Sequence, residues 1–114
     1  MQNKIINFLD FENVDIRLGT IIDAINYDEL KKPSIILKID FFDQLGIKKS
    51  SAQIRKNYQA SNLINKQVIA VVNFKPKQIG KIISEVLVLG LPDSENEPIL
   101  LSPDIKLKNG IKLY

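Results

Sequence analysis

The 114-residue sequence contains no cysteine and no histidine. Without thiols it can form neither disulfide bonds nor thiolate zinc sites, and a cysteine nucleophile is excluded. Without imidazoles it has no histidine general base and no Ser-His-Asp triad. The carboxylates are scattered, with neither the spacing of a calcium-binding loop nor a convincing acid/base pair. We therefore expect no catalytic residue, no metal site and no cofactor, and predict that the chain is not an enzyme.

Long apolar runs are missing as well. No segment approaches the roughly 18 apolar residues of a membrane-spanning helix. The N-terminal stretch MQNKIINFLDFENVD carries acids where a signal peptide has its apolar core. We therefore expect a cytoplasmic protein without membrane insertion. The composition, 45% hydrophobic and 25% charged, is typical of a globular chain, and its length predicts a single domain over residues 1–114.

Positive charge is concentrated in the middle of the sequence. Residues 31–82 contain eleven basic and two acidic residues, whereas residues 1–30 contain two and six, and residues 83–114 contain three and five. The net charge of the whole chain is only +3. A central segment this basic favours an anionic partner over a merely solvated surface.

Alternating apolar and polar residues predict a series of short strands. The expected strands cover residues 14–22, 34–42, 47–54, 68–74, 82–91 and 97–101. Gly19 is expected to mark a bulge or a sharp bend in the first of them. The pair Asn109-Gly110 is a hairpin signal. The first dozen residues could form a short amphipathic helix, and residues 55–66 have a helical pattern with Ser61 placed as an N-cap.

The order of these elements predicts an all-β fold. The strands are not separated by regular helices, which argues against a βαβ arrangement. One helical insertion lies between the third and the fourth strand. A five-stranded barrel of the OB type carries a short helix at this place. We therefore predict an OB-fold barrel with small terminal extensions.

The stretch NFKPKQIGK, residues 73–81, places a basic loop between two apolar strands. Pro76 ends the preceding strand because it has no backbone N–H to donate. Gly80 permits a tight reversal or a backbone close to a ligand. The loop contains the phosphate-binding candidates Lys75, Lys77 and Lys81. Composition alone supports a charged, solvated strand connector equally well.

Two further segments carry candidate contacts. Residues 48–56, KKSSAQIRK, combine four cations with small polar groups that suit phosphate oxygens and base edges; a polar strand face leading into a helix explains them equally well. The pair Ser84-Glu85 precedes the run VLVLGL, and Glu85 could accept a hydrogen bond from a base edge. Judged alone, the pair is better explained as part of an alternating strand. Tyr58 is the best candidate for base stacking, although core packing is favoured for it.

Five segments together carry a family resemblance: VDIRLGTI, GIKKSSAQIRKNY, QVIAVVNFKPKQIG, SEVLVLG and ILLSPD. In these segments the sequence resembles the CsaA family of export-related chaperones. It resembles, more distantly, the tRNA-binding domains appended to some aminoacyl-tRNA synthetases. The similarity runs from about Val14 to Tyr114. It implies an OB-fold barrel that forms a homodimer through elements flanking the barrel, including both termini.

The resemblance also implies two classes of ligand. One is unfolded or presecretory polypeptide, with a link to the Sec export machinery, for which the sequence identifies no binding residue. The other is tRNA-like RNA, bound through the basic loop and neighbouring strands. Carried over by motif, the implied RNA-binding residues are Asn73, Lys75, Lys77, Gln78, Lys81, Ser84 and Glu85, adjoined by Ser50, Ser51, Gln53 and Arg55.

One departure separates the two branches of this resemblance. The tRNA-binding domains usually continue with Ser-x-Gly-Met, whereas this chain has Ser84-Glu85-Val86-Leu87, as CsaA proteins do. The leading hypothesis is therefore a homodimeric chaperone that binds unfolded polypeptides in protein export. The alternative is a tRNA-binding module for structured RNA. Dimerisation is expected also because the apolar ends, Ile5–Phe11 and Ile99–Leu101, would be exposed on so small a monomer.

Overall fold

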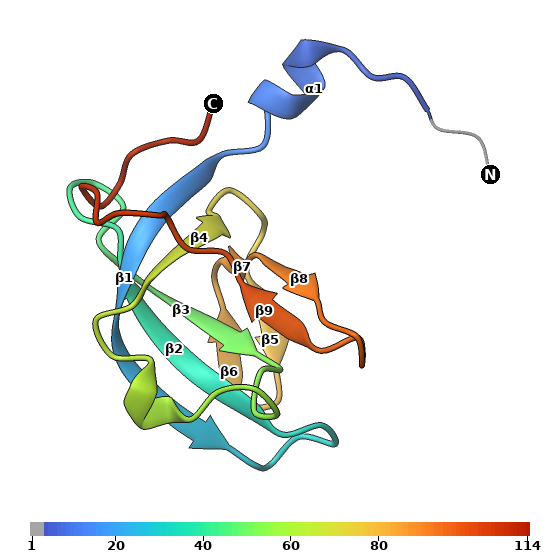
Figure 1. The fold of residues 1–114 in the computed structure, drawn as a ribbon, viewed down its shortest axis with the longest axis vertical. Coiled ribbons are helices and arrows are strands. Elements are labelled where there is room, and N and C mark those ends of the chain that lie inside the picture. The colour runs from blue at the N-terminus through green and yellow to red at the C-terminus, as the bar shows by residue number, and fades with distance from the viewer. Residues whose placement is uncertain (1–3) are drawn as a thin grey trace.

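The structure, a computed structural model, describes residues 4–114 and contains a five-stranded sheet that curls on itself (Figure 1). Its strands are antiparallel to their neighbours and follow the order β3-β2-β1-β4-β7. They are β1 (Ile16–Tyr27), β2 (Ser34–Asp40), β3 (Ile47–Ala52), β4 (Gln67–Val71) and β7 (Leu87–Val88).

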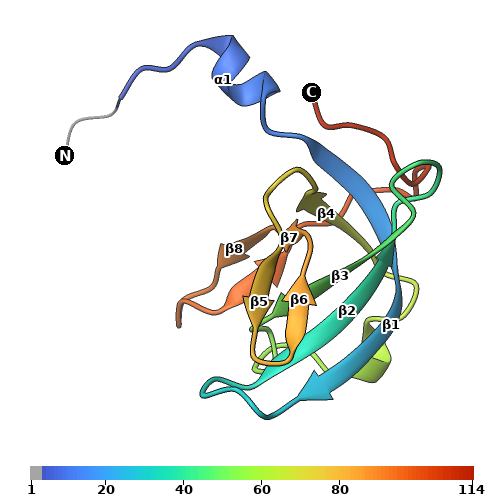
Figure 2. The same ribbon diagram turned by 180° about the vertical axis from the view of Figure 1, so that it is seen from behind.

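The remaining elements lie outside this sheet. Strands β5 (Lys77–Ile79) and β6 (Ile82–Ser84) form a hairpin beside β3 (Figure 2). Strands β8 (Gly90–Pro92) and β9 (Pro98–Leu100) form a second hairpin. Within the described residues, the helices are α1 (Phe8–Glu12) and the one-turn 3-10 helix η1 (Ala60–Asn62). Neither these nor any other helix within residues 4–114 has the length and hydrophobicity to cross a membrane.

The segment after β6 closes the sheet into a barrel. The backbone N–H groups of Glu85 and Val86 both donate to the carbonyl oxygen of Lys49 in β3, at N···O distances of 2.8 and 3.4 Å. The next residues form β7, which pairs with β4. The sheet therefore returns to its starting edge, which is the closure that an OB barrel requires. The predicted all-β OB fold is confirmed.

The core is built by the inward face of β2 and its neighbours. Ile35, Leu37 and Ile39 alternate along β2 and are fully buried, as is Phe41 just beyond the strand. The phenol oxygen of Tyr58 accepts a hydrogen bond from the backbone N–H of a β9 residue, and its ring packs against the core. Tyr58 is therefore a packing residue, as the sequence favoured.

Gly19 provides the space that the Phe41 ring occupies. A Cβ atom at this position would lie 2.6 Å from Cγ2 of Ile39 and 2.7 Å from Cδ1 of Phe41, far inside van der Waals contact. The prediction of a bulge at Gly19 is wrong. The register of β1 against β2 shifts between Ile21 and Asp23 instead. The glycine permits the close packing of Ile39 and Phe41 against β1.

The helix expected over residues 55–66 is reduced to η1. Ser61 lies inside this turn, and Gln59 takes the N-cap position, so the predicted cap is wrong. The backbone N–H of Asn65 donates to the carbonyl oxygen of Ile21, and the N–H of Ile21 donates to the carbonyl oxygen of Lys66. These bonds to β1 pull the chain out of a helix and into β4.

The structure also differs from the prediction in the strand at residues 82–91 and in the hairpin at Asn109-Gly110. The strand expected over residues 82–91 is divided into β6, β7 and β8, because the chain turns toward β3 at Glu85. The turn at Asn109-Gly110 forms, with φ of +90° at the glycine. The following residues pair with β1 rather than with the preceding segment, since Leu18 N–H donates to the carbonyl oxygen of Ile111. The predicted hairpin is therefore wrong. The helix expected within the first dozen residues forms only as α1, with Ile5 outside it, and residues 1–3 lie outside the described part of the chain.

Asp93 holds the turn between β8 and β9. One carboxylate oxygen accepts hydrogen bonds from the backbone N–H groups of Glu97 and Glu95, at 2.9 and 2.8 Å. The other accepts a hydrogen bond from the side-chain amide of Asn57 at 3.0 Å. These hydrogen bonds, first that from Glu97 and then that from Asn57, hold the pKa of Asp93 below its ordinary value of 3.8.

Asp93→Asn should be less stable than the wild type at neutral pH. The lowered pKa means that the folded state favours the ionised carboxylate, so its contribution is present above the unfolded-state pKa and is lost as the pH falls through the folded-state pKa. The difference in free energy of unfolding between the two proteins should therefore shrink below about pH 4. Urea unfolding from about pH 7 to about pH 3 measures this difference. A difference that does not change with pH would contradict the assignment.

Candidate functional site

A groove of about 450 Å³ opens beside β3 and the β5–β6 hairpin. We call it the basic groove. Its lining residues are Ser51, Phe74, Lys75, Lys77, Ile79, Ser84, Glu85, Val86 and Leu87. Phe74 and Leu87 are each about half exposed, at 53% and 50%. The groove therefore combines accessible apolar surface with lysine side chains.

Lys75 and Lys77 form no ion pair in the part of the chain that the structure describes. Within residues 4–114, neither ammonium group lies within 4.0 Å of a carboxylate oxygen. By contrast, Lys81 at the tip of the hairpin lies 3.5 Å from a carboxylate oxygen of Glu29, and Arg55 forms an ion pair with Asp28. The two groove lysines are therefore available to an anionic ligand.

A second pair of lysines extends this positive surface onto the sheet. Lys38 of β2 stands directly opposite Lys49 of β3, and both residues are exposed. Like charges in this arrangement destabilise a sheet, and neither ammonium group has an ion-pair partner in the described part of the chain. Ser51 follows Lys49 by two residues, on the same face of β3. The basic groove and this lysine pair thus share one side of the barrel.

Ser84 and Glu85 fasten the hairpin to β3. The backbone N–H of Ser51 donates to Oγ of Ser84 at 3.1 Å. The backbone N–H of Lys49 donates to a carboxylate oxygen of Glu85 at 3.0 Å. The other oxygen of that carboxylate lies 3.9 Å from the ammonium group of Lys48. Both side chains line the groove, but their polar atoms hold its two walls together.

Ser84→Ala should lower the free energy of unfolding by about 1–2 kcal/mol, because the Ser51 N–H loses its acceptor in a partly buried place. Urea unfolding measures this change, and Ser94→Ala, in the exposed turn after Asp93, is the matched control. Unchanged stability together with weaker ligand binding would instead assign the Ser84 hydroxyl to the ligand.

The structure gathers only part of the predicted RNA-binding set in the groove. The members that line it are Ser51, Lys75, Lys77, Ser84 and Glu85, while Asn73, Gln78, Lys81, Ser50, Gln53 and Arg55 do not. Asn73 binds the N-terminal segment, since its side-chain amide donates to the carbonyl oxygen of Asn13 and accepts from the N–H of Asp15. Gln78 donates to the carbonyl oxygen of Gly80, and Ser50 is only 2% exposed. A direct ligand contact for these residues stays a prediction.

The sequence did not identify the apolar lining of the groove. Leu87 belongs to the run VLVLGL, which resembles a buried strand, and only the division of that strand exposes it. Phe74 offered a weak signal, as an aromatic residue at a strand end beside lysine and proline. Lys38 was missed, because its position opposite Lys49, one of the four cations of residues 48–56, depends on strand register.

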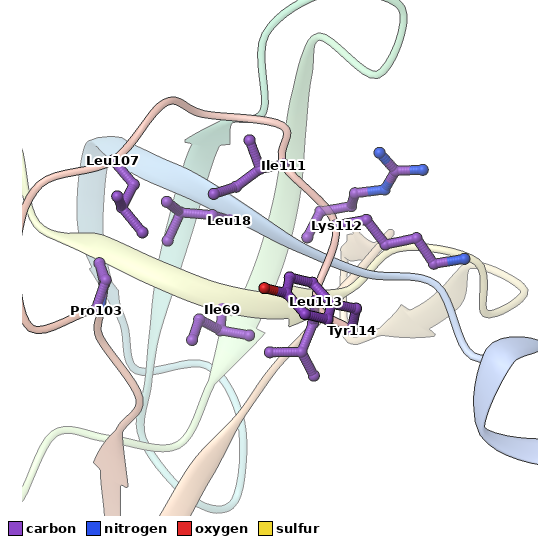
Figure 3. A pocket seen from close by; sticks show the side chains of 9 residues that line it. Leu18, Ile69, Pro103, Leu107, Ile111, Lys112, Leu113 and Tyr114 are labelled. Atoms are coloured by element: carbon purple, nitrogen blue, oxygen red, sulfur yellow. The ribbon is translucent and has the colours of Figure 1, made fainter. Parts of the chain in front are cut away.

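An apolar cleft of about 210 Å³ lies on another part of the surface, between β1, β4 and the C-terminal segment (Figure 3). We call it the C-terminal cleft. Its lining residues are Arg17, Leu18, Ile69, Pro103, Leu107, Ile111, Lys112, Leu113 and Tyr114. Leu18, Ile69, Leu107 and Ile111 line a common space in Figure 3.

Both ends of the chain expose apolar side chains. Helix α1 stands away from the barrel, near the C-terminus (Figure 1), and Phe8 and Leu9 on it are 71% and 62% exposed. The expected exposure of the N-terminal end is therefore confirmed. At the other end, Ile99 is 42% exposed as expected, but Leu100 beside it is buried. Further exposed apolar residues, among them Ile105 and Leu113, lie beyond the segment that the sequence predicted.

The described residues contain no group of three or more aspartates, glutamates, cysteines or histidines placed to hold a metal ion.

Comparison with known proteins identifies the kind of domain. The family model described as "Putative tRNA binding domain" matches residues 16–112. The chain belongs to this tRNA-binding domain family.

Two solved structures, both of CsaA chaperones, assign the chain more closely within this family. The CsaA chaperone from Bacillus anthracis str. Ames is 46% identical, with a TM-score of 0.89, and the match covers 97% of this chain and 100% of that one. The CsaA chaperone from Picrophilus torridus is 48% identical, with the same TM-score, over 96% and 100% of the two chains.

A curated relative shows where else such a domain occurs. The methionine–tRNA ligase of Pyrococcus horikoshii is 32% identical over 108 residues, which is 95% of this chain but 14% of the ligase. This chain thus spans about one seventh of the length of the curated relatives that it matches. The matched part corresponds to a tRNA-binding domain and not to a catalytic one.

Proposed function

We propose that this CsaA-type domain is a molecular chaperone whose basic groove binds extended polypeptide segments. One observation supports this most directly: half-exposed Phe74 and Leu87 lie in the same groove as Lys75 and Lys77, which have no ion-pair partner among the described residues. Unfolded chains offer apolar side chains to such a groove, and lysines attract their acidic neighbours. In protein export, the groove would hold presecretory polypeptides unfolded until the Sec machinery takes them.

The exposed apolar area predicts weak binding per groove. Covering the exposed half of one of these side chains contributes roughly 1 kcal/mol. After the cost of immobilising a flexible segment, one groove holds a peptide only transiently. A chaperone that must release its client needs this weakness. Two grooves on one particle would raise the affinity for a long unfolded chain without any additional interaction in either groove.

A homodimer would supply the second groove. The exposed side chains of α1 and the C-terminal cleft are apolar surfaces at the ends of the same chain, and a second copy would cover both. Sedimentation velocity at about micromolar concentration should give a dimer. The variant Phe8→Ser/Leu9→Ser should shift it to monomer, and a wild-type protein that is monomeric at this concentration would contradict the dimer.

Aggregation of a denatured client tests the chaperone. Sub-stoichiometric wild-type protein should suppress light scattering, and Phe74→Ser/Leu87→Ser should lose most of this effect. Leu91→Ser is the matched control, since Leu91 is 62% exposed and lies outside the basic groove. Absence of suppression by the wild type, together with absence of peptide binding in calorimetry, would refute the chaperone function.

A second ligand, tRNA, is favoured by a separate observation. Four lysines without ion-pair partners in the described residues lie on one side of the barrel: Lys38, Lys49, Lys75 and Lys77. Their spacing over three strands and a loop suits a phosphate backbone better than a single small anion. We propose that tRNA and polypeptide use overlapping parts of this surface and therefore compete.

A further inference from the structure

The loop between β1 and β2, residues 28–33, places two carboxylates beside the basic surface. Asp28 forms an ion pair with Arg55, which follows β3. A carboxylate oxygen of Glu29 lies 3.5 Å from the ammonium group of Lys81, at the tip of the β5–β6 hairpin. Two of the cations implied in RNA binding are thus already paired within the chain, unlike Lys75 and Lys77.

Side chains of Tyr27, the last residue of β1, and of Leu30 in the loop lie against the tip of the hairpin. The N–H of Lys81 donates to the phenol oxygen of Tyr27 at 3.2 Å. Gly80 has φ of +61°, and a Cβ atom there would lie 2.8 Å from that oxygen and 3.0 Å from Cδ2 of Leu30. The absence of a side chain at Gly80 therefore permits Tyr27 and Leu30 to lie close to the tip of the hairpin. The carboxylates consequently stay close to the hairpin even when their ion pairs open.

The ion pairs themselves are easily exchanged. The side chains of Lys81 and Glu29 are 83% and 59% exposed, and that of Asp28 is 69% exposed. Water and salt screen such exposed pairs, so each is weak. A phosphate can replace Glu29 beside Lys81, but the displaced carboxylate remains nearby and repels the following phosphates. An extended peptide has few negative charges and meets little of this repulsion.

We propose that Asp28 and Glu29 are specificity-determining residues that disfavour RNA relative to polypeptide at the basic groove. This inference rests on the proposed function, since it concerns the choice between its two ligands. The two acids act as an internal competitor for Lys81, at the tip of the hairpin that lines the groove, and for Arg55. The two acids leave the apolar lining of the groove untouched, so they weaken polypeptide binding little. They weaken RNA binding, because they occupy Arg55 and Lys81 and lower the positive electrostatic potential that attracts phosphates.

The test compares Asp28→Asn/Glu29→Gln with a control of equal charge, Asp43→Asn/Asp104→Asn. Neither Asp43 nor Asp104 has an ion pair or a side-chain hydrogen bond within residues 4–114. Circular dichroism and thermal melting first establish that both variants are folded. Each is then titrated with bulk tRNA and with a fluorescent unfolded peptide of near-zero net charge. Glu29→Gln alone provides a milder second variant.

The loop variant should bind tRNA about three- to tenfold more tightly than the wild type at ~50 mM salt, with a steeper salt dependence. Its peptide affinity should change less than about twofold. The same gain in the control, or an equal gain for peptide, would overturn the selectivity. A wild type that binds neither probe would refute the proposed function as well. Normal binding of both probes with an unchanged ratio would refute the selectivity alone.

Discussion

Lys75→Ala/Lys77→Ala should bind tRNA about 10- to 100-fold more weakly than the wild type at ~50 mM salt. The two ammonium groups have no carboxylate partner within residues 4–114, so a phosphate that binds them displaces only water and counterions. Each lysine–phosphate interaction that the double variant loses should also lower the slope of log affinity against log salt by about one. Filter binding over a salt series gives both quantities.

A control of equal charge separates this effect from net charge. Lys66→Ala/Lys106→Ala removes two lysines that line another part of the surface, beside Ser102 and Asp104. It should change the affinity less than about threefold and leave the slope nearly unchanged. If both double variants lose affinity equally, binding follows total charge, and the basic groove is not the RNA site.

Phe41→Ala should lower the free energy of unfolding by about 3–5 kcal/mol, the largest stability loss expected for a single substitution in this chain. Phe41 is fully buried and its ring occupies the space above Gly19. Gly19→Ala should cost about 1–3 kcal/mol, because its Cβ atom would overlap that ring and Cγ2 of Ile39. Urea unfolding of both variants measures these values.

The double variant tests whether the two costs share one cause. Removing the ring clears most of the space that the new Cβ atom needs, so Gly19→Ala should cost less in the Phe41→Ala background. Strict additivity would contradict this packing. It would also mean that Gly19 is required for the backbone conformation of β1 and not for contact with the ring.

The sequence predicts the barrel well because the alternation of apolar and polar residues indicates which face of each strand is buried. β2 is an example: Ile35, Leu37 and Ile39 alternate in the sequence and are fully buried in the fold. The predictions fail where non-local hydrogen bonds decide the local structure. The Lys49 carbonyl interrupts the long apolar strand near Glu85, and bonds to Ile21 remove the expected helix. No local pattern in the sequence encodes these partners.

The candidate site was predicted in part for the same reason. Lys75 and Lys77 are visible in the sequence as charges beside a proline, and the structure places both in the groove. The apolar lining was not visible, because Leu87 looks like a core residue until the division of its strand exposes it. Whether a cation is paired depends on the fold. Lys81 and Lys77 look equivalent in the sequence, yet only Lys81 faces a carboxylate.

Competition between the two proposed ligands tests the central claim most directly. A fluorescent unfolded peptide is bound to the wild-type protein, and tRNA is then titrated into the same preparation at low salt while anisotropy is followed. If the basic groove and its lysines form one shared site, tRNA should release the peptide completely, and the reverse titration should release tRNA. Simultaneous binding of both at saturation, or binding of neither, would contradict the account.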